Sequence, residues 1–266
     1  TIFKVYKFLL YKLKSFKNFI VPILANFPYR IIRREKRNEL FKNRKFLSYL
    51  RTYEKSNYLL KIFDDSTSQF HQDLFVLSTL KYKKDGFFIE MGACDGIEIS
   101  NTFVLEKYFD WDGILVEPSK TYHKNLKKNR NCNIDFRCVY NTSGEKISFN
   151  STRSPSISTI DLYSSSDRFD LDRYGGERYT VETITLNNLL KFYNAPKNID
   201  YLSLDTEGSE YEILKAFNFD YYKIKIITVE HNYTKKRELI YNLLISKNYE
   251  RVFKESSSCD DFYILK

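Results

Sequence analysis

In the stretch FFIEMGACDG, residues 87–96, an apolar run is followed by a charged turn that contains two glycines. Four of its first five residues are apolar, which predicts a buried strand. Gly92 and Gly96 free the backbone for a sharp turn and for close approach to a ligand. The pattern is not G-x-G-x-x-G, so it predicts no pyrophosphate cradle. The carboxylates of Glu90 and Asp95 would instead attract a cation.

A second strand ends in the same way. GILVEPS, residues 113–119, is apolar up to Glu117. In open α/β sheets ligands bind beyond the carboxyl ends of the strands, and an acid after the second strand suits ribose hydroxyls. An acid near a cationic group and a second acid on a ribose together describe a site for S-adenosylmethionine. The alternative is two surface turns with incidental acids.

Strand-like and helix-like runs alternate through the rest of the chain. This rhythm predicts a three-layer α/β sandwich with a mostly parallel sheet. Two runs at the C-terminus, separated by a short Ser-rich turn, predict a closing antiparallel hairpin. The expected strands lie in residues 86–91, 113–118, 133–140, 146–150, the first part of 179–193, 198–205, 223–231, 249–256 and 260–266. The expected helices lie in residues 100–109, 119–129, the second part of 179–193, 209–217 and 235–248.

The N-terminal segment differs from the remainder in charge. Residues 1–50 hold 13 Lys and Arg but 2 Asp and Glu, and the remaining 216 residues hold 30 and 32, a net charge of −2. Apolar residues recur at spacings of three and four from Ile2 to Ile20, with lysines on the opposite face. We therefore expect a basic amphipathic helical arm over residues 1–60, followed by one domain over residues 61–266.

The arm leaves two roles open. Residues 1–37, which include RIIRREKR, would suit a helix lying on an anionic membrane surface. The same apolar face would equally suit packing on the body or on a sister subunit, which makes a homo-oligomer an open alternative. No apolar run approaches the ~18–20 residues that span a bilayer. Four cysteines without a C-x-x-C pair suggest reduced thiols, so we expect a cytoplasmic protein, or one peripheral on the inner face of the membrane.

Four strings together carry a family resemblance. FFIEMGACDGIEISNT, WDGILVEPS, IDYLSLDTEGSEYEIL and ITVEH resemble the FkbM family of S-adenosylmethionine-dependent methyltransferases, over about residues 69–265. The resemblance implies a class I methyltransferase (Rossmann-like) fold, with a seven-stranded sheet. It also implies S-adenosylmethionine as the cofactor and O-methylation, often of sugars or natural products.

The resemblance also implies a cofactor site, residue by residue. The methionine end of the cofactor would lie against Glu90, Gly92, Ala93, Asp95 and Gly96. Glu117 would hold the ribose, with Pro118 and Ser119 near the adenine. The residues that would close the pocket are Asn101, Gln72 and Asp73.

Acids gather where the later strands end. An alcohol acceptor has to lose a proton, so a general base is useful. One strand ends at Asp205, with Glu207 in the following turn, and another ends at Glu230 and His231. We expect these four to be catalytic, with His231 as the natural base near neutral pH. The alternative is that the acids cap helices and that His231 has a structural role beside them. An acidic pair with a histidine would also suit a divalent metal. No ligand spacing demands a metal, however, and we predict none.

Residues 151–179 interrupt the alternation. Their length and their Ser, Asp, Arg and Gly content predict an insertion or lid loop that sets specificity. A solvated insertion without a substrate role is the alternative. The candidate contacts to a glycan with acidic or phosphate groups are Arg153, Arg168, Arg173, Tyr174 and Arg178.

Three functions remain open at this point. The chain has no N-P-P-Y, D-P-P-Y or Pro-Cys string, which favours oxygen over nitrogen or cytosine carbon as the methyl acceptor. The leading hypothesis is O-methylation of a saccharide or polysaccharide hydroxyl, of capsule or lipopolysaccharide type. RNA ribose 2'-O-methylation is the second, although the near-neutral body argues against nucleic acid. The third is a non-catalytic binding module that keeps the fold.

Overall fold

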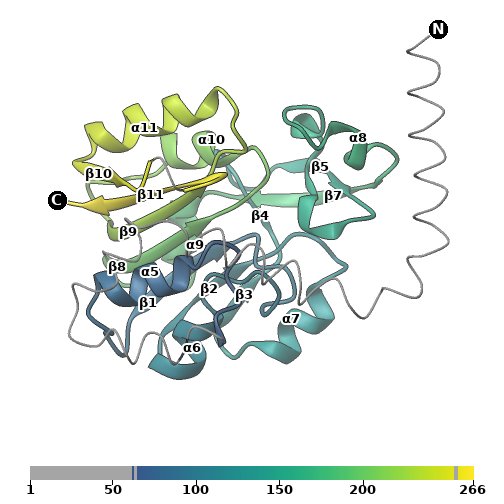
Figure 1. Cartoon of the computed structure of the whole chain (residues 1–266). Coiled ribbons are helices and arrows are strands. Elements are labelled where there is room, and N and C mark those ends of the chain that lie inside the picture. Colours follow the sequence, from purple (N-terminus) through teal and green to yellow (C-terminus); the bar gives the residue numbers. More distant parts are fainter. Residues whose placement is uncertain (1–61, 63–64, 255–256) are drawn as a thin grey trace, which may run out of the picture. The chain divides into compact units, whose positions relative to one another are not determined.

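The structure, a computed structural model, describes residue 62, residues 65–254 and residues 257–266. Seven strands form its larger sheet, in the order β10-β11-β9-β8-β1-β2-β3 (Figure 1). These strands are β1 (Phe87–Met91), β2 (Asp112–Val116), β3 (Asn133–Asp135), β8 (Asn198–Leu204), β9 (Lys223–Glu230), β10 (Tyr249–Val252) and β11 (Asp260–Leu265).

Five neighbouring strands of the larger sheet run in the same direction, and one strand runs against its neighbours. β3, β2, β1, β8 and β9 are parallel to one another, whereas β11 is antiparallel to both of its neighbours, β9 and β10. The expected mostly parallel sheet with a C-terminal hairpin is therefore confirmed. The hairpin does not simply extend the edge, because its second strand inserts between β9 and β10.

Helices cover both faces of this sheet. Apolar side chains of α9, α10 and α11 share one core with Ile89 and Met91 of β1. Neighbouring residues of a strand point to opposite faces, so Phe88 and Glu90 face the other side. Figure 1 shows α10 and α11 on one side of the sheet and α5 and α6 on the other. The helices are α5 (Gln72–Thr79), α6 (Phe103–Phe109), α7 (His123–Asn129), α9 (Leu186–Phe192), α10 (Glu210–Lys215) and α11 (Lys236–Ser246).

A second, four-stranded sheet has the order β4-β7-β5-β6. The strand expected over residues 133–140 divides to supply it, because the backbone turns at Asp135, whose carboxylate accepts from the backbone N–H and side chain of Arg137. The strands of this sheet are β4 (Cys138–Val139), β5 (Lys146–Ser151), β6 (Thr159–Ile160) and β7 (Glu177–Ile184).

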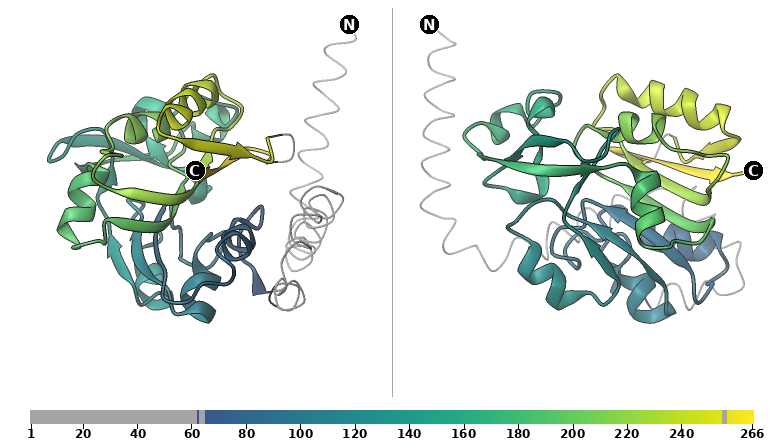
Figure 2. Two further views of the ribbon diagram at one scale, coloured as in Figure 1. Left: turned by 90° about the vertical axis from the view of Figure 1, so that its left-hand side faces the viewer. Right: turned by 180° about the vertical axis from the view of Figure 1, so that it is seen from behind.

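The insertion over residues 151–179 is folded rather than an open loop. It contains the 3-10 turns η2 (Pro155–Ile157) and η3 (Asp161–Tyr163), strand β6 and the short helix α8 (Asp170–Arg173). A small core of Phe149, Ile160 and Tyr163 with two neighbours holds it together. Figure 2 shows this part of the chain set to one side of the seven-stranded sheet.

The arm expected over residues 1–60 lies outside the described residues. Among the helices that the structure describes, none is long and apolar enough to cross a membrane.

Candidate active site

A cavity that is open to solvent lies where β1, β2 and β8 end. Its walls come from these three strand exits, from β4 and β5 of the second sheet, and from the insertion. The exits contribute Gly92, Cys94, Glu117, Pro118, Asp205 and Glu207. The insertion contributes Pro155, Ser156, Ser158 and Ile160. Among the residues that the structure describes, no Lys, Arg or His side chain lines the cavity.

Gly92 sets the shape of the first exit. Its φ of 79° lies in the left-handed region that favours glycine. A Cβ at this position would collide with the backbone carbonyl oxygen of Asp205. The turn after β1 and the turn after β8 therefore approach as closely as they do because residue 92 has no side chain. The turn at Gly92 lines the cavity, as expected of a glycine that allows close approach to a ligand.

Glu117 joins the first two exits. Its Oε2 accepts a 2.9 Å hydrogen bond from the Cys94 backbone N–H, and its Oε1 accepts a 2.7 Å bond from the Ser119 N–H. Burial raises the pKa of Glu117 to about 7, while the two backbone N–H groups lower it. Each carboxylate oxygen has a second lone pair, so both remain able to accept from the hydroxyls of a ribose.

Glu90 has a different position from the one expected. Because it alternates with the cavity-lining Met91, its side chain lies on the opposite face of β1. Its carboxylate accepts hydrogen bonds from Ser100 Oγ at 2.8 Å and from the Asn101 N–H and Thr102 Oγ1, both at 2.5 Å. Arg130 lies 3.7 Å away. In this structure Glu90 anchors the turn that starts α6, and it does not line the cavity.

The residues expected to close the pocket also lie outside the cavity walls, as the described residues form them. Gln72 Nε2 donates to Asp260 at 2.6 Å, and Asn101 Nδ2 donates to Ser203 Oγ at 2.8 Å. Asp73 accepts from Ser66 Oγ at 2.8 Å, and burial raises its pKa to about 6. Their side chains hold α5 and the turn before α6 on the neighbouring strands.

The remaining expected cofactor residues belong to the two turns. Asp95 accepts from the backbone N–H groups of Ile97 and Glu98, at 2.9 and 2.7 Å, and thereby shapes the turn after β1. Ala93 is buried in that turn, and Gly96 has a φ of 82°. Pro118 lines the cavity, and Ser119 contributes its N–H to Glu117. Their contact with the cofactor stays a prediction.

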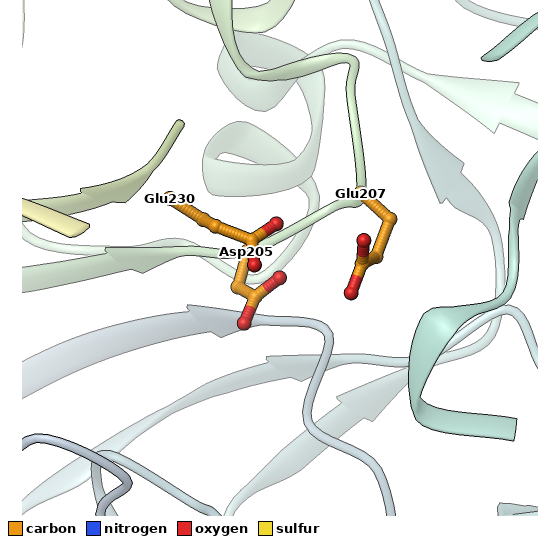
Figure 3. Close-up of side chains that lie close together, drawn as sticks. All are labelled: Asp205, Glu207 and Glu230. Atoms are coloured by element: carbon orange, nitrogen blue, oxygen red, sulfur yellow. The ribbon is translucent and has the colours of Figure 1, made fainter. Parts of the chain in front are cut away.

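Three carboxyl groups meet beside the cavity. Asp205 follows β8, Glu207 lies two residues further on, and Glu230 ends β9, the neighbouring strand. One oxygen from each lies within 4.8 Å of the others, and Figure 3 shows the three groups around a common space. Carboxyl groups at this distance share protons or hold a cation. The prediction that no metal is present stays a prediction.

Asp205 and Glu230 form the inner pair of this group. Burial raises the pKa of both far above the usual range. Repulsion from Glu207 adds to the rise at Asp205, and repulsion from Asp205 adds to the rise at Glu230. One carboxyl oxygen of Asp205 lies within 4.8 Å of one of Glu230, and at such a separation a buried carboxyl pair shares a proton. The pair can therefore take up a proton near neutral pH, as a general base must.

Glu207 is held from two directions. Its Oε2 accepts from Arg173 Nη2 at 2.6 Å and from Asn232 Nδ2 at 3.2 Å. Its backbone has a φ of 59°, in the left-handed region. Burial raises the pKa of Glu207 to about 8, although the guanidinium of Arg173 opposes that rise. The sequence singled out Glu207, but it gave no sign that a residue of the insertion would bind it.

His231 is not at the cavity. Its Nδ1 accepts from the Tyr233 backbone N–H at 3.0 Å, and its Nε2 lies 3.8 Å from Asp261, which also binds Arg237. Burial lowers the pKa of His231 to about 4, so it is neutral near pH 7. The placement does not support the expected role as base, because the His231 ring lies beside Tyr233 and Asp261 and does not line the cavity.

The insertion's arginines do not line the cavity that the described residues form. Arg173 is fully buried, and Arg178 pairs with Asp161 at 3.1 Å. Arg168 stacks on Phe169, with 4.7 Å to the ring centroid. Arg153 and Tyr174 are exposed. The insertion residues that do reach the cavity were missed: they are Pro155, Ser156, Ser158 and Ile160, and their only signal was their place in an unusually long segment.

The sheet order and the cavity at the strand exits define a class I methyltransferase. A family model described as the methyltransferase FkbM domain matches residues 90–256. The match spans well over half of the chain, so the chain belongs to the FkbM methyltransferase family. S-adenosylmethionine is therefore its methyl donor. The residues present fit it: Glu117 offers oxygens for the ribose, and Asp205 and Glu207 offer negative charge for the sulfonium.

Solved structures with a similar arrangement include several methyltransferases. Precorrin-6y C5,15-methyltransferase from Geobacter metallireducens is 11% identical, with a TM-score of 0.38 over 72% of this chain and 85% of that one. Ribosomal protein L11 methylase from Lactobacillus delbrueckii is 10% identical, with a TM-score of 0.37 over 74% and 76%. A methyltransferase from Pyrococcus furiosus is 14% identical, with a TM-score of 0.35 over 71% and 78%. Scores at this level support no conclusion about this chain. No curated protein matches it in sequence.

Proposed function

We propose that this methyltransferase acts on oxygen and that its acceptor is a hydroxyl group of an uncharged saccharide. The observation that carries the proposal is the pair of buried carboxyl groups of Asp205 and Glu230, whose oxygens lie within 4.8 Å of each other beside the cavity. A hydroxyl has to lose its proton during transfer, and a carboxyl pair with raised pKa values is suited to take it.

The carboxyl pair of Asp205 and Glu230 has one role in the reaction, and the other residues of the cavity have another. When bound, S-adenosylmethionine supplies a methyl group on a sulfonium. Asp205 lines the cavity and would take the proton of the acceptor hydroxyl. The acceptor oxygen would bond to the methyl carbon while the donor's carbon–sulfur bond breaks, and a neutral thioether would leave. Glu230 shares the proton and keeps the pair from carrying two charges. Glu117 holds the donor in place, so much of the rate comes from alignment of the two reactants.

The charge of the cavity bears on the acceptor. Its ionisable lining residues are the acids Glu117, Asp205 and Glu207 with two thiols, and no described basic side chain offsets them. Such walls offer no cation to pair with a phosphate or carboxylate group, whereas a neutral sugar hydroxyl needs none. The arginines expected to bind an acidic glycan point elsewhere. This favours a neutral saccharide over an acidic glycan and over the phosphate-rich backbone of RNA.

The acceptor class can be tested with labelled donor. Radiolabelled S-adenosylmethionine is incubated with the full chain and one of three acceptor pools: neutral glycans, uronic-acid glycans or RNA. We expect label in the neutral pool, stable to mild base as an ether is. Transfer to RNA or to the acidic pool alone would contradict the proposal.

The N-terminal arm suggests where the enzyme works. Residues 1–50 carry a net charge of +11, and we propose that residues 1–37 hold the enzyme on an anionic membrane surface where polysaccharides are assembled. Flotation with vesicles of anionic phospholipid compares the full chain with a version that starts at residue 38. Equal flotation of both would contradict the membrane role.

A further inference from the structure

Arg173 is the largest fully buried side chain in the described part of the chain. It comes from α8, a four-residue helix in the insertion, rather than from the main core. A buried guanidinium is costly unless its N–H groups are paired. The groups that pair with Arg173 offset this cost.

The partners of Arg173 come from two parts of the fold. Within the insertion, Nη1 donates to both oxygens of Asp167 at 2.9 Å, and Nε donates to the Ile157 carbonyl oxygen at 2.8 Å. From the exit of β8, Glu207 accepts from Nη2 at 2.6 Å. One side chain thus bridges the insertion and the β8 exit.

Both ends of this bridge lie at the cavity. Ile157 stands between Ser156 and Ser158, which line it, and Glu207 lines it from the other side. A second bond runs beside the bridge, because Thr159 Oγ1 donates to the Glu207 carbonyl oxygen at 2.8 Å. The distance between these two walls of the cavity is therefore set through Arg173 and Thr159.

We propose that Arg173 is a positioning residue, which fastens the insertion's cavity wall to Glu207 and keeps Glu207 ready to face a cationic donor. This proposal rests on the proposed function in one respect: it takes Asp205, the neighbour of Glu207, to be the base that receives the proton of the acceptor hydroxyl. It makes the insertion a fixed wall rather than a lid that opens.

The charges around Glu207 show why Arg173 matters. The acids that face Glu207 are Asp167, Asp205, Glu210 and Glu230. Arg173 is the cation paired with it, and no other described cation lies within ion-pair distance of its carboxylate. Lys236 binds the Gly208 carbonyl oxygen and faces Glu210. Without Arg173, Glu207 would face four acids, and the neutral Asn232 would be its remaining hydrogen-bond donor.

Two substitutions separate positioning from general support of the fold. Arg173→Met removes the cation, and Asp167→Asn removes the other acid bound to Arg173 but leaves the pair with Glu207. Calorimetry measures S-adenosylmethionine affinity of the full chain from pH 6 to pH 9.5, and Glu207→Gln identifies the part of the profile that belongs to Glu207. No acceptor is needed, so the result is independent of whether a saccharide is the substrate.

The two substitutions should move the pH profile in opposite directions. Ionised Glu207 attracts the sulfonium, so affinity should rise with pH through the pKa of Glu207. We expect Arg173→Met to raise the midpoint by about one pH unit and to weaken binding about tenfold at pH 7.5, since a cation is lost. Asp167→Asn should lower the midpoint or leave it in place. An unmoved midpoint in Arg173→Met, or an equal upward move in both, would overturn the proposal.

Arg173→Lys covers the case in which Arg173→Met does not fold. Lysine keeps the charge but lacks the planar fork that reaches Ile157, Asp167 and Glu207 together. We expect a midpoint near that of the unsubstituted chain, with faster hydrogen exchange of the backbone amides in residues 156–160 and 206–209. Unchanged exchange in both segments would overturn the proposed bridge.

Discussion

The backbone N–H of Cys94 donates a 2.9 Å hydrogen bond to Oε2 of Glu117, which ties the exit of β1 to the exit of β2. The bond places a buried carboxylate between two turns that line one cavity.

Replacing Glu117 with Gln should impair donor binding. The amide keeps the shape of the side chain but loses the charge, and its NH₂ group faces a backbone N–H. We expect the dissociation constant of S-adenosylmethionine to rise about 10- to 100-fold, as for loss of a buried charge-assisted bond. Glu182→Gln, an exposed residue of β7, is the matched control and should bind as the unsubstituted chain does. Equal binding by both variants would remove Glu117 from the donor site.

Replacing Gly92 with Ala should damage both stability and binding. Gly144 supplies a matched control, since its φ of 80° is nearly that of Gly92 but a Cβ there would meet no atom within 4 Å. Gly144→Ala should cost about 1 kcal/mol of unfolding free energy, from the backbone alone. Gly92→Ala should cost about 3 kcal/mol, because the collision with Asp205 is added to the backbone strain. Urea denaturation measures both; equal losses would show that the turns can separate freely.

His231 should be dispensable for chemistry. His231→Gln removes the imidazole that lies between Tyr233 and Asp261, so we expect the midpoint of thermal unfolding to fall by several degrees. Methyl transfer at 25 °C should stay within about threefold of the unsubstituted chain, because the ring does not reach the cavity. A loss of about 100-fold or more in transfer, with the fold intact, would restore His231 as the base.

Stability should fall as pH rises through the pKa of Asp73. Burial raises that pKa from 3.8 to about 6, so the folded state favours the protonated acid more than the unfolded chain does. The contribution is complete below about pH 4 and is lost as pH rises through about 6, a change of up to about 3 kcal/mol. Asp73→Asn should flatten this part of the stability profile between pH 4 and pH 8. A profile that keeps its slope in the variant would assign the effect to other buried acids.

A chelator should leave the enzyme active. Asp205 and Glu230 already share a proton, and Glu207 is bound by Arg173, so the three acids are satisfied by partners within the protein. We expect dialysis against EDTA to leave methyl transfer unchanged. Loss of transfer with recovery on adding Mg²⁺ or Mn²⁺ would instead make the three acids a metal site.

The sequence predicted the fold more fully than the site. The alternation of strand-like and helix-like runs, together with the four quoted strings, predicted the seven-stranded sheet. That alternation repeats along the chain and can therefore be recognised in the sequence. The carboxyl ends of the strands were also enough to bring Asp205, Glu207 and Glu230 together, since parallel strands end at one edge.

The sequence did not show which way a side chain points or what binds it. Glu90 faces away from the cavity because it precedes Met91 by one residue on a strand, and His231 faces away because it follows Glu230 by one. Arg173 was expected to contact a glycan, and nothing in the sequence indicated its partners Asp167 and Glu207, which lie 6 and 34 residues away. Pairings over such separations leave no local periodicity in the sequence.

The central claim is that Asp205 takes the proton of an acceptor hydroxyl. The most direct measurement compares Asp205→Asn with the unsubstituted chain for methyl transfer to neutral glycan and for S-adenosylmethionine affinity. We expect transfer to fall about 100- to 10,000-fold, the usual range for loss of a general base, with donor affinity changed less than about tenfold. Transfer by the variant at the normal rate, with donor bound normally, would contradict the account.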